Sequence, residues 1–105
     1  MTDEQKAIFD ILRHGKELVQ KEKNEIKKLS VELLEELKKD KLKPEQWAEK
    51  ATTVAAVYNF VNNTLYEKLP FPTYQNDDID LKSNLVFSHL RSQYLGGGIS
   101  VYGGY

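Results

Sequence analysis

The sequence predicts an all-α fold, in which four helices are followed by an extended, glycine-rich C-terminal tail. Two observations lead to this class. Four segments repeat apolar residues at steps of three and four, the spacing that puts side chains on one face of a helix. In addition, no segment combines the alternation of a strand with turn residues on both sides. The expected helices cover about residues 3–13, 20–40, 44–68 and 77–94, within a helical domain at 1–95.

The length and the composition are those of one domain. The chain has 105 residues, which is enough for a single hydrophobic core. Its formal net charge is −1, so there is no overall positive excess of the kind that favours nucleic acid. The absence of cysteine excludes disulfides and thiolate metal sites. No apolar run approaches the roughly 20 residues of a membrane span, and the polar N-terminus is unlike a signal peptide, so we expect a cytoplasmic protein.

The first two expected helices have clear apolar faces. Thr2 and Gln5 have the spacing of a capping box, and Gly15 follows the end of the first helix. The second helix has no Ser, Thr, Asp or Asn cap near Gln20. Its apolar stripe is nevertheless continuous, and Lys and Glu cover its other faces. The stripe consists of Ile26, Leu29, Leu33, Leu34 and Leu37.

The third helix is expected to be the central one, because its apolar surface is the widest. Pro44 suits a first helical turn, where the missing N–H is harmless. Pro70 and Pro72 stop the helix and predict a stiff, extended link. Apolar residues between these prolines alternate in steps of four and three, like a seam against a partner helix. The seam consists of Trp47, Ala51, Val54, Tyr58, Val61 and Leu65.

The fourth helix leads into the tail. Residues 76–78 can cap this helix, and its apolar face ends at Tyr94. Three glycines at 96–98 then stop the helix. The tail at 96–105 is expected to be flexible or to be ordered by a partner. Its residues 99–102 form a strand only if they find an edge with which to pair.

No group of residues indicates a catalytic, cofactor-binding or metal site. His14 and His89 have no second ligand at metal spacing, so both are interpreted as structural. The string Glu36-Leu37-Lys38 matches the Glu-x-Lys of metal-dependent nucleases, but it lies within a charged helix rather than on a sheet. The three glycines follow a helix C-terminus, whereas phosphate loops precede a helix N-terminus. We therefore predict that this domain alone is not an enzyme.

Lysines in and after the second helix leave an alternative function open. A row of lysines can follow the phosphate backbone of a nucleic acid. Here glutamates are interleaved with the lysines, which is typical of a solvated helix surface. Direct nucleic-acid binding and a generic helical interaction domain therefore remain the alternatives. The lysines concerned are Lys21, Lys23, Lys27, Lys28, Lys38, Lys39, Lys41 and Lys43.

The end of the chain carries the candidates for contact with a partner protein. Tyrosine is favoured at protein interfaces, and the tyrosines of a glycine-rich tail cannot all enter a small core. A β-prone segment can also pair with the sheet edge of a partner. The candidate partner-binding residues are Arg91, Tyr94, Ile99, Val101 and Tyr102.

Several segments resemble a known family in their order and spacing. They are EQKAIFDIL at 4–12, KKLSVELLEELK at 27–38, WAEKATTVAAV at 47–57, LPFPTY at 69–74 and VFSHLRSQYLGGGISVY at 86–102. Together they resemble the helical C-terminal domain of the R subunit of type I restriction endonucleases. One departure concerns residues 53–58, which read TVAAVY where the family commonly carries arginines, so a salt bridge or phosphate contact is not expected from them.

The resemblance implies a role in assembly. In the family, the nuclease and the ATP-driven translocase lie upstream of this domain, and the domain is implicated in attaching them to a methyltransferase core of modification and specificity subunits. The resemblance therefore implies ATP and Mg²⁺ as cofactors of the parent protein, with none held by this domain. It also implies contact with DNA through the whole complex and no contact with a membrane. A chain cut from a longer protein would lack the catalytic parts, whereas a complete product would be an isolated docking module.

Overall fold

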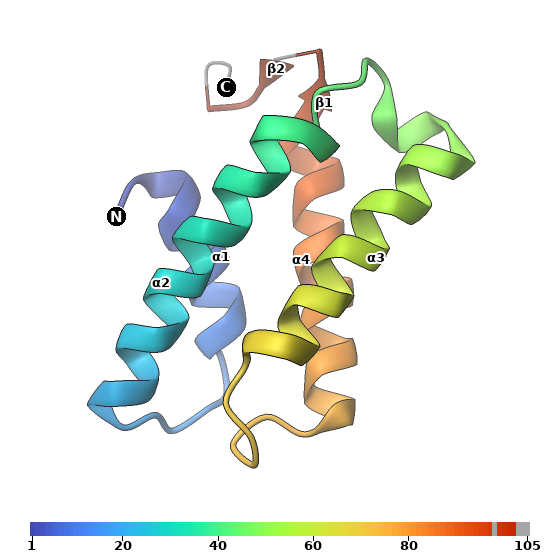
Figure 1. Ribbon diagram of the computed structural model, residues 1–105. Helices are drawn as coiled ribbons and strands as arrows, with labels where there is room; N and C mark the ends of the chain where they lie inside the picture. Colours follow the sequence, from blue (N-terminus) through green and yellow to red (C-terminus); the bar gives the residue numbers. More distant parts are fainter. Residues whose placement is uncertain (98, 103–105) are drawn as a thin grey trace.

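The computed structural model describes residues 1–97 and 99–102. Successive helices run in opposite directions and form an up-and-down bundle (Figure 1). Within it, α1 contacts α2 and α4, and α3 also contacts α2 and α4. The all-α class predicted from the sequence is confirmed. The four α-helices are α1 (Asp3–Arg13), α2 (Gln20–Glu36), α3 (Ala51–Lys68) and α4 (Asn76–Gln93).

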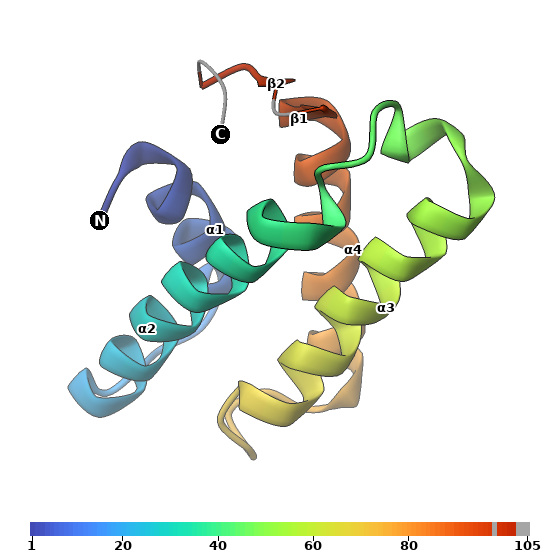
Figure 2. The ribbon, with the colours of Figure 1, turned by 45° about the horizontal axis from the view of Figure 1, so that its top comes forward.

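Short elements complete the fold at one end of the bundle. The second helix continues into a π-helical turn, η1 (Leu37–Lys41), and a 3-10 turn, η2 (Trp47–Glu49), precedes α3. After α4, strands β1 (Tyr94–Gly96) and β2 (Ile99–Ser100) pair in antiparallel fashion. Figure 2 shows this hairpin beside the loop that joins α2 to α3. We call β1, β2 and the following residues 101–102 the C-terminal hairpin.

Local sequence accounts for most helix ends. The capping box predicted for α1 is confirmed, since the Gln5 amide donates to Thr2 Oγ1 at 3.2 Å and the Thr2 amide donates to Gln5 Oε1 at 3.0 Å. Gly15 follows α1 at a φ of 76°, which suits glycine. At the start of α4, the Gln75 amide donates to Asp78 Oδ2 at 3.0 Å. That helix therefore begins one residue earlier than predicted.

The predicted start of the third helix is wrong. This helix begins at Ala51 rather than near Pro44, because Gln46 adopts the left-handed conformation, with φ 53° and ψ 37°, and Lys50 is extended, with φ −108° and ψ 124°. Trp47 lies in η2 and is fully buried, and its indole Nε1 donates to the Tyr94 carbonyl at 3.1 Å. This long-range contact outweighs the helical pattern on which the prediction relied.

The buried face of α3 also differs from the predicted seam. Val61 and Leu65 are buried as predicted, but the third buried residue of this helix is Val57. Ala51 is exposed, and Val54 is only half-buried. Because α2 and α4 each bury more residues than α3, the third helix is not the most enclosed element that its apolar composition predicted.

The link between α3 and α4 is a turn, not the extended segment that was expected. The Tyr74 amide donates to the Pro70 carbonyl at 2.9 Å, and the Phe71–Pro72 peptide is cis. Tyr74 is fully buried, and its hydroxyl donates to the Leu12 carbonyl at 2.7 Å. Burial raises the pKa of Tyr74 to about 12. The link therefore closes the bundle against the end of α1.

One hydrophobic core runs through the bundle and includes the predicted stripe of α2, which is buried throughout. Over residues 1–97 and 99–102, no helix has both the length and the apolar character needed to cross a membrane. The largest fully buried side chains include Trp47, Tyr74, Tyr94, Ile8, Leu12, Ile26, Leu33, Leu37, Leu42, Leu65, Leu90 and Val57.

Candidate functional site

Backbone hydrogen bonds hold the C-terminal hairpin on the bundle. The Gly97 amide donates to the Lys43 carbonyl at 2.8 Å, and the Val101 amide donates to the Gln93 carbonyl at 2.9 Å. The part of the predicted tail that the structure describes is therefore folded onto its own domain rather than extended from it. Gly98 and residues 103–105 of that tail lie outside the described residues.

Gly96 makes the close approach between the hairpin and the loop before α3 possible. Its φ is 87°, in the region that favours glycine. A Cβ added there would lie 2.3 Å from the Pro44 carbonyl oxygen and 3.2 Å from Trp47 Cδ1. The glycine therefore has a packing role. The predicted role of Gly96 in ending the fourth helix is wrong, because α4 ends at Gln93 and Gly96 lies in β1.

Tyr94, predicted to bind a partner, is buried within this chain instead. Its hydroxyl donates to Glu4 Oε1 at 3.0 Å, and Lys38 Nζ donates to the two oxygens of the same carboxylate at 3.1 and 3.2 Å. These three side chains join the hairpin, α1 and η1. Tyr94 therefore positions the hairpin and is not available on the surface. The spacing of apolar residues in the fourth helix predicted that Tyr94 lies on its apolar face. No pattern in the sequence near Tyr94 indicates that its hydroxyl donates to Glu4 on α1.

The other candidate partner-binding residues lie at or beside the hairpin surface. Arg91 is exposed on the last turn of α4, with its guanidinium Cζ 6.0 Å from the centre of the Phe87 ring. The Val101 side chain is 59% exposed and the Tyr102 side chain 37% exposed. Ile99 pairs through its backbone position with Gly96.

Leu95 is a candidate that the sequence analysis missed. It is 57% exposed between the buried Tyr94 and Gly96, because neighbouring residues of a strand face opposite sides. We define the hairpin surface as Leu95, Val101 and Tyr102, which are exposed apolar residues of the C-terminal hairpin.

Lys82 is a second residue that sequence analysis missed. It lies among the buried positions of α4, and its Nζ donates to the His14 carbonyl at the end of α1 at 2.6 Å. Burial lowers the pKa of Lys82, the nearby Lys16 lowers it further, and Asp78 raises it. Its spacing of three from Ile79 and four from Val86 was the available signal of a lysine on a buried face.

His89 has a structural environment. Its Nε2 is buried and has no hydrogen-bond partner among the described residues, and its ring centre lies 6.5 Å from that of Tyr94. Burial lowers the pKa of His89, so the neutral imidazole is favoured. In the described part of the chain, no three His, Asp or Glu side chains converge to hold a metal ion.

The lysines considered for nucleic-acid binding do not form one row. Lys38 turns inward to Glu4. Lys28 Nζ lies 3.9 Å from Glu32 Oε1 on the surface of α2. Of the predicted lysine face, Lys28, Lys38 and Lys41 thus pair with carboxylates, whereas Lys23 and Lys27 line a pocket together with residues of α1.

Comparisons with protein families, curated proteins and solved structures give no match to this chain. The anchored hairpin surface is the feature that most favours contact with another macromolecule, because apolar side chains are exposed there on a segment that the bundle already holds in place.

Proposed function

We propose that this chain is an assembly module that docks the R subunit of a type I restriction enzyme onto its methyltransferase core. The observation that carries the proposal is the hairpin surface, where Leu95 and Val101 are each more than half exposed. Hydrogen bonds from Gly97 to Lys43 and from Val101 to Gln93 order this surface before any partner arrives. An ordered surface binds more tightly than a flexible tail, because less conformational entropy is lost on binding.

The composition of this region supports a protein partner. Tyr102 and Arg91 are of the residue types that are enriched at protein interfaces, and both are exposed near the end of the chain. The family resemblance of the sequence supplies the identity of the partner, which is the pair of modification and specificity subunits. In this proposal the complex works in the cytoplasm and reaches DNA as a whole. ATP and Mg²⁺ serve the motor and nuclease parts of the parent protein, and this domain catalyses nothing by itself.

The experiment measures binding of the chain to the purified modification–specificity methyltransferase of the same cell. The double variant Leu95→Asp/Val101→Asp places charges on the hairpin surface and should weaken binding by more than about tenfold. The matched control is Phe71→Asp, because Phe71 is 81% exposed on the loop at the opposite end of the bundle (Figure 1).

Two results would contradict the docking proposal. Binding that the double variant leaves unchanged would exclude the hairpin surface as the contact. Binding that both variants weaken equally would indicate a nonspecific effect of added negative charge. Melting temperatures of both variants should stay near that of the parent chain, because all three positions are exposed. Strong binding at high salt is also expected, since an apolar interface is not weakened by salt as a phosphate interface is.

A further inference from the structure

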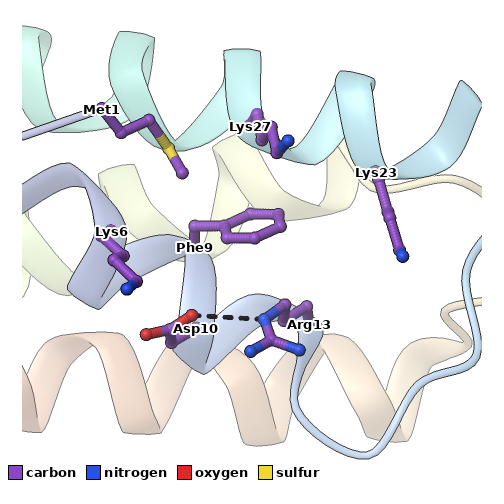
Figure 3. A pocket seen from close by; sticks show the side chains of 7 residues that line it. All are labelled: Met1, Lys6, Phe9, Asp10, Arg13, Lys23 and Lys27. Atoms are coloured by element: carbon purple, nitrogen blue, oxygen red, sulfur yellow. Dashed lines mark hydrogen bonds and ion pairs between the residues drawn. The ribbon is translucent and has the colours of Figure 1, made fainter. Parts of the chain in front are cut away.

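An open pocket between α1 and α2 gathers positive charge on a chain whose net charge is −1. Figure 3 shows Phe9 between side chains of α1 on one side and side chains of α2 on the other. The pocket shares no residue with the hairpin surface. The residues that carry the argument are Phe9, Asp10, Lys6, Arg13, Lys23 and Lys27.

The cations of this pocket outnumber its carboxylates. Among the described residues, Asp10 provides the single carboxylate of the pocket, and Arg13 Nε lies 3.2 Å from its Oδ1. Within residues 1–97 and 99–102, the remaining cations, Lys6, Lys23 and Lys27, form no ion pair. Like charges that face one pocket repel one another, and a bound anion relieves that repulsion.

On α2, the lysines of the pocket lie on one stripe of the helix. Lys23 and Lys27 are one turn apart, and neither has an acidic residue three or four positions away. The stripe of Lys21 and Lys28, on another side of the helix, differs, because Glu25 lies four residues after Lys21 and three before Lys28. The lysines of the pocket are thus set apart from the alternating charges that cover the rest of the helix.

Phe9 organises the cations around the pocket. Its side chain is buried, and its ring centre lies 5.6 Å from Arg13 Cζ and 5.9 Å from Lys27 Nζ. Cation–π attraction to one ring holds a cation of α1 close to a cation of α2. The two charges are therefore positioned before a ligand binds, which reduces the entropy lost on binding.

We propose that the pocket between α1 and α2 binds the phosphate group of a small phosphorylated ligand. A phosphate carries up to two charges and several acceptor oxygens, which match the excess of cations better than a single carboxylate does. A compact ligand is favoured over a long nucleic acid, because the stripe of α2 that carries Lys23 and Lys27 has no further cation one turn away, where Gln20 and Val31 stand.

The test is titration calorimetry of the full chain with inorganic pyrophosphate at low ionic strength. The variant Lys23→Gln/Lys27→Gln should raise the dissociation constant by about tenfold or more, from the loss of charged hydrogen bonds. The matched control is Lys21→Gln/Lys28→Gln, which removes the same charge from another side of α2, outside the pocket, and should leave binding nearly unchanged. The variant Asp10→Asn should tighten binding, because it removes the only carboxylate of the pocket.

The remaining outcomes separate this proposal from its rivals. Thermal melting should confirm that the variants are folded, since glutamine is as compatible with an exposed helix as lysine. No binding of pyrophosphate, or equal losses in the two double variants, would overturn the proposal. Equal affinity for polyglutamate would show a general preference for anions and would also overturn it. Binding of a single-stranded oligonucleotide without binding of pyrophosphate would replace it with contact to a nucleic-acid backbone.

Discussion

Replacing Gly96 by alanine tests whether the C-terminal hairpin is anchored on the bundle or is only a loosely attached tail. The added Cβ would lie 2.3 Å from the Pro44 carbonyl oxygen and 3.1 Å from the Gln46 amide nitrogen, so the backbone must shift. A φ of 87° adds a cost of about 1–2 kcal/mol for a residue with a Cβ. Overpacking against the loop adds about 1–3 kcal/mol. We therefore expect Gly96→Ala to lower the free energy of unfolding by about 2–5 kcal/mol.

The control for this prediction is Gly15→Ala. Gly15 has a similar positive φ of 76°, but a Cβ added there would meet nothing within 4 Å. Only the conformational cost of about 1–2 kcal/mol applies to this variant. The difference between the two variants therefore isolates the contact between the hairpin and the loop before α3.

Thermal melting followed by circular dichroism measures both variants. In a domain of this size, each kcal/mol corresponds to a shift of roughly 4–8 °C in the melting temperature. Gly96→Ala should thus melt roughly 10 °C or more below the parent chain. If it melts at the same temperature as Gly15→Ala, the close approach of Gly96 contributes nothing to stability. The reasoning about an anchored hairpin would then be refuted.

Two further predictions concern His89 and the buried face of α3. Because burial lowers the pKa of His89 in the folded chain, the unfolded chain binds more protons as the pH falls past about 6.5, and stability decreases. His89→Gln should therefore reduce the fall in melting temperature between about pH 7.5 and about pH 5.5. The same fall in the variant as in the parent chain would contradict this. Val57→Asp should cost about 3–5 kcal/mol in urea unfolding, since it buries an unpaired charge. Val54→Asp should cost much less because Val54 is half-buried, and equal losses would favour the seam expected from sequence.

Local patterns were sufficient to predict the helices and several of their ends. The capping box of Thr2 and Gln5 and the apolar stripe of α2 depend on residues three or four positions apart, so their physics is contained in short segments. The end of α3 also follows from local chemistry, because Pro70 cannot continue a helix. The all-α class is the sum of these local preferences.

Contacts between distant segments could not be predicted in the same way. Trp47 and Tyr94 are 47 positions apart, and their hydrogen bond belongs to the arrangement that turns the predicted start of α3 into a loop. Lys82 reaches the end of α1 across 68 positions. The pocket around Phe9 likewise needs two helices in register. Some residues of the candidate sites could therefore be predicted from the sequence. Their exposure and their grouping could not, because both depend on tertiary structure.

The contact between Tyr94 and Glu4 has a consequence for how the chain folds. The two residues are 90 positions apart, so their hydrogen bond closes almost the whole polypeptide into a single loop. Such a contact forms late and raises the contact order above that of a bundle held only by neighbouring helices. During synthesis, the hydrogen bond between Tyr94 and Glu4 can form only after the last turn of α4 and the strand that follows it have left the ribosome. Truncation of either end of the chain should therefore destabilise the packing of the other end.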